Sequence, residues 1–152
     1  MTTKLTLFTI GGVSAFTYAI ITFGLYVYLW TRWGVIRGSD VSQILMTVDR
    51  KHGEWTVLWW SITIIPYAMI PVFLAVLNAL WKDDAALASM AFIAGMIALI
   101  LGIIGPLRSA TTTGTLAHIF ATGDEAQKAA AQVLYKTGES YGRGLFCLFG
   151  AT

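Results

Sequence analysis

Charged side chains are scarce in this chain and unevenly spread. Only 12% of its 152 residues are charged, about half the share of an average soluble domain, while 57% are hydrophobic. No Asp, Glu, Lys, Arg or His occurs in Leu5–Trp30, Trp55–Trp81 or Ala85–Leu107. About 20 apolar residues are enough to cross a bilayer as a helix, so these stretches predict an all-α integral membrane protein. We expect full spans at about 7–30, 55–81 and 85–107.

Cysteine is nearly absent, and no strong charge of one sign is present. The single cysteine, Cys147, excludes an internal disulfide framework and a multi-cysteine metal site. The formal net charge is only +2, without the concentrated basic patch that nucleic-acid binding requires. The first apolar run continues without a clear cleavage site, so we interpret it as a retained anchor.

A fourth apolar run, 141–152, is too short to cross a bilayer as a helix. Two interpretations stay open. Either the sequence stops inside a fourth span, which makes this run an incomplete span, or the run is a re-entrant or partly inserted tail. We favour the incomplete span, because nothing like a helix cap follows Gly150.

Small residues and prolines mark three places in the spans. Small residues recur four apart in two stripes, Gly11, Ala15 and Ala19 and then Ala94, Ala98 and Gly102. Such stripes let helix backbones approach closely in lipid, so we expect both to be helix-packing faces. Pro66 and Pro71 each remove a backbone donor and predict a kink in the second span.

Two amphipathic helices are expected at the membrane surface between spans. In 40–49, Val41, Ile44, Leu45 and Val48 fall on one helical face. In 123–137, Thr122 and Glu125 match a capping box at the start, and Gly138 can close the end. The Thr-rich segment 108–122 before this second helix is expected to be an irregular loop.

The segment around the second surface helix resembles a known family. It reads GTLAHIFATGDEAQKAAAQVLYKTGESYGRGLF, and it is similar to the bacterial membrane-protein family catalogued as domain of unknown function 4386. The matching positions are Ile119–Thr122, Asp124–Ala131 and Gly138-Glu139, within a likeness that covers about residues 60–150. The resemblance implies a multi-span protein of about six or seven helices in the full family pattern, and it implies no particular reaction.

Few residues suggest chemistry. The three spans hold no ionisable acid or base, which argues against a proton-coupled transporter. His52 and His118 are weak candidates for a haem or metal, because no carboxylate or cysteine stands at ligand spacing. We therefore expect no catalytic centre, no metal and no cofactor other than bound lipid.

Three functions follow in order of preference. The first is a non-catalytic accessory or scaffold subunit that packs against other transmembrane helices, in a homo-oligomer or a larger complex. The second is a small transporter, channel or lipid-handling protein with a cavity at the Pro66/Pro71 kink. The third is a membrane haem or redox protein. Eight of the ten Lys and Arg residues fall on one side of the predicted spans, which favours an inner-membrane protein with its N-terminus outside.

Overall fold

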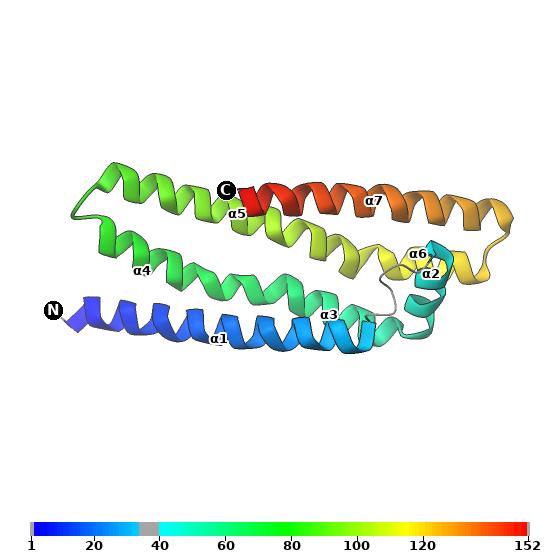
Figure 1. Ribbon diagram of the computed structural model, residues 1–152, viewed down its shortest axis with the longest axis horizontal. Helices are drawn as coiled ribbons and strands as arrows, with labels where there is room; N and C mark the ends of the chain where they lie inside the picture. Colours follow the sequence, from blue (N-terminus) through cyan, green and yellow to red (C-terminus); the bar gives the residue numbers. More distant parts are fainter. Residues whose placement is uncertain (1, 34–39, 152) are drawn as a thin grey trace.

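The described part of the chain is helical throughout. The computed structural model describes the backbone of residues 2–33 and 40–151, and the side chains of residues 6–33, 40–142 and 144. Most helices run along the long axis of the molecule, and two short ones, α2 and α6, lie at one end of it (Figure 1). The elements are α1 (Thr2–Trp33), α2 (Val41–Arg50), α3 (His52–Ile64), the 3-10 helix η2 (Ile65–Met69), α4 (Ile70–Leu80), α5 (Ala85–Thr111), α6 (Thr113–Thr122) and α7 (Glu125–Ala151).

Three helical stretches are long and apolar enough to cross a membrane, and each contains most or all of one predicted span, although the third continues beyond 107 to Thr122. They are Thr6–Trp33, His52–Leu80 and Ala85–Thr122. Large apolar side chains point outward along them, with Phe16 69% and Phe23 72% exposed on α1. In water such exposure would cost about 25 cal/mol for each Å² of apolar surface, so these faces belong in lipid. The prediction of an all-α protein with three apolar spans is confirmed.

The second span is interrupted where its prolines lie. Pro66 is in η2, and Pro71 is in the first turn of α4. Pro71 has no N–H to give to the Tyr67 carbonyl, and the Ile70 N–H donates to that carbonyl instead. The tighter turn of η2 therefore satisfies the backbone group that the proline would leave unpaired.

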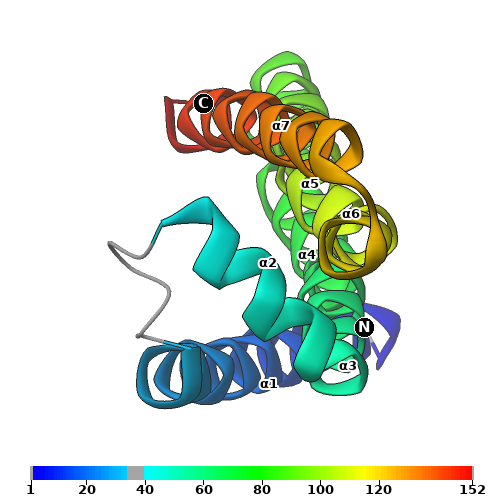
Figure 2. The same ribbon diagram turned by 90° about the vertical axis from the view of Figure 1, so that its right-hand side faces the viewer.

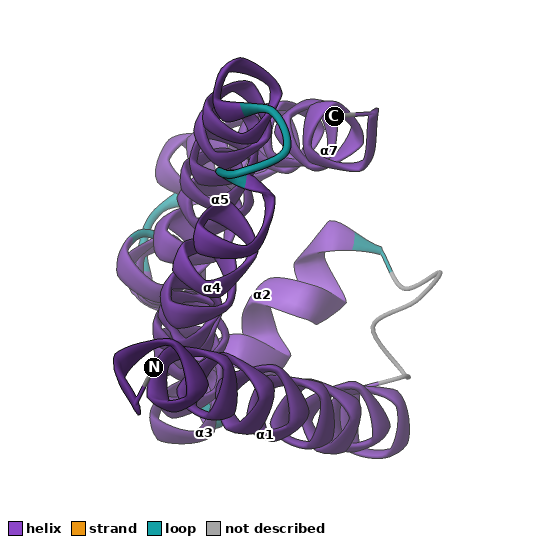
Figure 3. Cartoon of the chain, turned by 90° about the vertical axis from the view of Figure 1, so that its left-hand side faces the viewer, coloured by secondary structure: helices purple, strands orange, loops and turns teal. Residues whose placement is uncertain are grey.

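The helices are arranged as a C when seen along the long axis. Figures 2 and 3 show α3, α4, α5 and α6 stacked as the back of the C, with α1 and α7 as its two arms. α1 packs against η2 and α4, and α7 packs against α5 and α6. α2 crosses one end of the C, where it contacts α6.

α2 confirms the helix expected at 40–49, but protein buries its apolar face. Leu45 and Val48 are completely buried, in a cluster with Trp33, Trp55 and Ala117. α2 is therefore part of a packed cap at one end of the spans. Asp40 begins α2, where hydrogen bonds from the Ser42 hydroxyl and then the Val41 N–H hold the pKa of Asp40 below its ordinary value.

The C-terminal third differs from the sequence-based expectation in three ways. The expected loop 108–122 is helical, because α5 continues to Thr111 and α6 follows after one residue. The expected surface helix and the described part of the expected incomplete span belong to one continuous helix, α7, which runs from Glu125 to Ala151. Gly138 does not end a helix. Packing of α7 along α5 and α6, with Ala131 and Tyr135 buried, overrides the local tendency of glycine to close a helix.

Gly11 marks the closest contact between α1 and α4. A Cβ atom at Gly11 would lie 2.7 Å from the Ala75 Cβ and 3.3 Å from the Pro71 carbonyl oxygen, whereas one at Gly12 would meet nothing within 4 Å. We expect Gly11→Ala to lower the free energy of unfolding in detergent by about 1–3 kcal/mol, because the two backbones must separate. Gly12→Ala is the matched control. Equal melting temperatures for the two variants would contradict this contact.

The stability of the packed cap that α2 forms at the end of the spans should depend on Leu45. Leu45 is 0% exposed, and its neighbour Met46 is 47% exposed on the same helix. Leu45→Ala should lower the free energy of unfolding by about 2–5 kcal/mol, because apolar burial is lost and a cavity is left. Met46→Ala should lower it by well under half of that. Thermal unfolding of both variants followed by circular dichroism measures the difference. A loss of the same size from Met46→Ala would mean that α2 is not packed as described.

Candidate functional site

A groove runs inside the C, between its two arms. Its volume is about 740 Å³. Its walls come from α1, from the α3–η2–α4 segment, from α5 and from α7. Figures 2 and 3 show α1 and α7 at opposite ends of the stacked helices. The groove is therefore bounded by all the long helices.

Small residues on α5 make room for the groove. Gly95, Ala98, Gly102 and Gly105 line it, and none of them has a side chain that would fill the space. The predicted stripe on this helix is split, because Ala98 and Gly102 face the groove while Ala94 is exposed. In this chain, two of the three stripe residues border a cavity.

The stripe on α1 is also divided. Gly11 is buried against α4, Ala15 is half-buried and Ala19 is exposed. The groove face of α1 is formed by larger residues further along the helix, among them Tyr18, Thr22 and Leu25. Among the glycines of α1 that the structure describes, only Gly11 marks a tight contact with another helix.

One end of the groove carries its charges. Arg108 and Ser109 of α5 and Glu139 of α7 all line this end. The Arg108 guanidinium donates to the Tyr135 carbonyl (Nη2···O 3.2 Å). A Cβ atom at Gly138 would overlap the same guanidinium. The absent side chain of Gly138 therefore gives Arg108 its place between α5 and α7.

Tryptophans hold α1, α3 and α5 together at the same end. The Trp33 and Trp55 rings meet edge to face with centroids 5.2 Å apart, and the Trp59 ring lies 5.3 Å from Trp55. The Trp55 indole N–H donates to the Ser109 carbonyl (Nε1···O 3.0 Å). This bond joins α3 to α5 next to the charged end of the groove.

Two groove residues carry buried polar atoms that lack a partner. Among the described side chains, neither the Thr22 hydroxyl nor the Trp59 indole N–H has a hydrogen-bond partner, although both atoms are buried. Leaving a buried donor unsatisfied costs about 1–3 kcal/mol. Such a cost at a cavity wall is relieved when a ligand supplies an acceptor.

Sequence reasoning found part of this site. Pro66 lines the groove, as the kink hypothesis expects, but Pro71 does not belong to the lining. Pro106 and Arg108 also line it, and neither stood out in the sequence. The available signal was that Arg108 is the first charge after a long apolar span.

The two histidines lie in the cap, outside the groove lining. His52 packs against Gly114 of α6, where an added Cβ would lie 2.5 Å from its Nε2. His118 faces Asp49 of α2, with Nδ1 and Oδ1 3.4 Å apart. No group of three or more His, Cys, Asp or Glu side chains gathers anywhere in the described chain.

The reciprocal cap of α7 is formed two residues after the expected pair. The Gln127 N–H donates to the Asp124 carboxylate (2.8 Å), and the Asp124 N–H donates to the Gln127 side-chain oxygen (3.0 Å). Thr122 is the last residue of α6, and its hydroxyl donates to the His118 carbonyl. Glu125 pairs with Lys128 on the surface instead. α6 continues through Thr122, so the residue directly before α7 is Asp124, and its carboxylate accepts from the first turn of α7 in place of the Thr122 hydroxyl.

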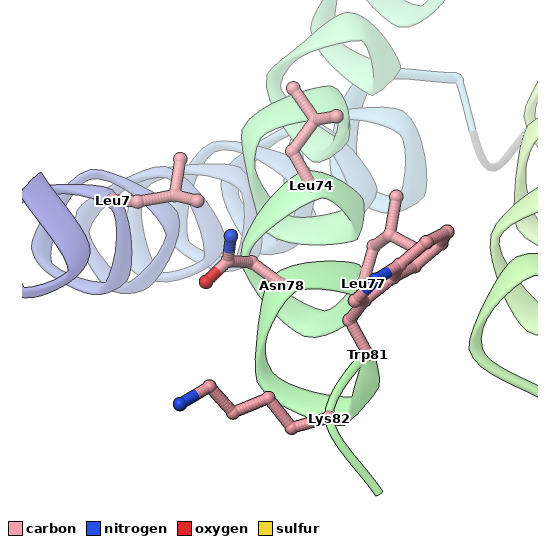
Figure 4. Close-up of a pocket in the computed structure, with 6 residues that line it drawn as sticks. All are labelled: Leu7, Leu74, Leu77, Asn78, Trp81 and Lys82. Carbon is pink, nitrogen blue, oxygen red and sulfur yellow. The ribbon is translucent and has the colours of Figure 1, made fainter. Parts of the chain in front are cut away.

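A second, shallower pocket of about 450 Å³ lies near the opposite end, where α1 passes α4. Figure 4 shows Asn78 and Lys82 extending on the side of Leu7, while Trp81 stacks beside Leu77. Asn78, Trp81 and Lys82 are all exposed. Such residues are typical of a helix end in the headgroup layer.

No family model matches this chain, and neither a curated protein nor a solved structure matches it. The groove and its lining therefore carry the functional argument.

The indole of Trp55 should help to fix the charged end of the groove. We expect Trp55→Phe to reduce stability by about 1 kcal/mol, because the ring contacts survive but the bond to Ser109 is lost. Trp60→Phe, on the exposed side of the same helix, is the control. Thermal unfolding in one detergent compares them, and an unchanged melting temperature for Trp55→Phe would show that this bond does not join α3 to α5.

Proposed function

We propose that this protein is a non-catalytic, lipid-binding membrane protein that holds a membrane lipid in the groove. One observation carries the proposal: the groove is apolar along most of its length and has its charged groups, Arg108 and Glu139, at one end. A lipid has the same division between an apolar body and a polar head. A volume of about 740 Å³ also lies within the usual range for small-molecule sites.

The arrangement of the helices favours entry from the bilayer. The arms α1 and α7 flank the groove, and the outer faces of the long helices are apolar. A lipid would therefore pass between the arms without leaving the hydrocarbon layer. Lipid handling is part of the second of the three functions considered from the sequence, and Pro66 lies in the wall of the groove.

A second candidate is the accessory or scaffold role. It is favoured by the small residues that α5 presents to the groove, because Gly and Ala faces suit close approach of another transmembrane helix. The occupant would then be a helix of a second copy or of a larger complex.

We also propose a multi-pass location in the inner membrane, with the N-terminus outside. Support comes from the eight of ten Lys and Arg residues that fall in the last turn of α1, in the connector after it and in the segment from Arg108 onward. Membership of the family of domain of unknown function 4386 stays a prediction from the quoted segment. His52 and His118, the weak candidates for a haem or metal, lie outside the groove lining.

Filling the groove tests lipid binding. Ala98→Trp places an indole in the groove, whereas Ala94→Trp places the same side chain on the exposed face one turn earlier. We expect Ala98→Trp to reduce the lipid retained per protein about fivefold or more, since overpacking costs about 1–3 kcal/mol, and Ala94→Trp to leave it unchanged. Native mass spectrometry after mild detergent extraction counts the lipids.

Two results would contradict the proposal. Wild-type protein that retains no lipid would show that the groove does not bind one. A stoichiometric protein partner that is lost in Ala98→Trp but kept in Ala94→Trp would assign the groove to another helix and favour the accessory role.

A further inference from the structure

We propose that the groove selects a glycerophospholipid whose headgroup carries a primary amine. The phosphate binds Arg108, the amine binds Glu139, and an acyl ester carbonyl accepts from the Trp59 indole. This inference rests on the proposed lipid binding and adds the chemical class of the ligand.

The first step is the paired charge at one end of the groove. Arg108 on α5 and Glu139 on α7 line the same end. A guanidinium is well suited to phosphate, because its N–H donors form a planar fork. One of these donors bonds the Tyr135 carbonyl, and a carboxylate has several acceptor sites. Cation and anion together fit a zwitterion.

The second step compares lipid headgroups by the charge and the hydrogen-bond donors that they bring to Glu139. A primary ammonium donates hydrogen bonds to the carboxylate, and a quaternary ammonium has no N–H to donate. A phosphate linked to an uncharged alcohol leaves Glu139 without a counter-charge from the ligand. A lipid with a primary amine therefore offers its phosphate to Arg108 and hydrogen-bond donors to Glu139, in addition to the contacts that these side chains make within the protein.

The third step concerns how deep Trp59 lies in the bilayer relative to the charged end of the groove. The hydrogen bond from Trp55 to Ser109 places Trp55 of α3 at the same depth as the charged end of the groove. Trp59 lies four residues further along the same helix, which is about 6 Å at 1.5 Å per residue. The polar layer on each side of a bilayer is about 5–7 Å thick, so Trp59 lies where phosphates give way to ester carbonyls.

The fourth step is the unsatisfied indole. The Trp59 N–H is buried and has no acceptor among the described residues, while the residue itself lines the groove. A turn of the indole brings this N–H to an ester carbonyl in the groove. The Thr22 hydroxyl is less informative, because a hydroxyl in a helix can rotate to a carbonyl of its own chain.

The headgroup is tested in nanodiscs that contain equal parts of phosphatidylethanolamine and phosphatidylcholine. Lipid retained by the wild-type protein, counted by native mass spectrometry, should favour the ethanolamine lipid. Glu139→Gln should reduce that preference about fivefold, because a charge-assisted bond becomes neutral. Glu54→Gln, an exposed acid on α3, should keep it. Arg108→Gln should reduce retention of both lipids.

The ester contact is tested with Trp59→Phe against Trp60→Phe, a neighbouring exposed tryptophan. Trp59→Phe should weaken retention of the diester ethanolamine lipid about fivefold and leave the diether analogue unchanged, because the ether lacks the carbonyl. Trp60→Phe should change neither. An equal loss of diester and diether lipid would show that the indole only packs, and would overturn the ester contact.

The outcomes also separate this inference from the proposed function. Retention that responds to Ala98→Trp but is equal for the two headgroups, before and after Glu139→Gln, would overturn the headgroup selection and leave lipid binding standing. Absence of retained lipid in every variant, wild type included, would overturn both.

Discussion

The long uncharged stretches determine both the helical conformation of the chain and the kinds of contact that hold its helices together. In hydrocarbon a backbone N–H or C=O has no water to bind, so each stretch must form a helix that satisfies its own groups. Lipid is also as apolar as leucine, so helices gain little from hiding apolar side chains from it. Cohesion then comes from close contacts such as Gly11 against Ala75, and from hydrogen bonds such as that from Trp55 to Ser109. Where neither is present, the helices stay apart and the groove remains.

The cap formed by α2 and α6 at one end of the spans is held together differently, by buried apolar side chains. Leu45 and Val48 are completely buried there, beside the rings of Trp33 and Trp55. Lys51 lies 5.4 Å from the centre of the Trp33 ring, a cation–π contact at the boundary between cap and spans. This cluster ties α1, α2, α3 and α6 at one end, so the charged end of the groove is also its best-braced part.

Much of the fold was predictable, because composition and periodicity act locally. The long stretches without charged residues predicted the spans, and the prolines predicted the break at η2. The helical spacing of apolar residues predicted which face of α2 is buried. The continuity of α7 was not predictable, because Gly138 reads as a helix end until Arg108 of another helix is seen to occupy its free side. Four-residue spacing likewise cannot tell whether Ala98 and Gly102 meet a helix or an empty groove.

The position of α1 and α7 on the two arms has a consequence for biogenesis. Chains are made from the N-terminus, and α7 follows the other walls of the groove in that order. Until α7 has emerged and packed on α5, the small-residue face of α5 borders the open bilayer, and Glu139 has not reached Arg108. The groove is therefore closed only after α1 to α6 have been made, in a membrane whose lipids already border its incomplete wall.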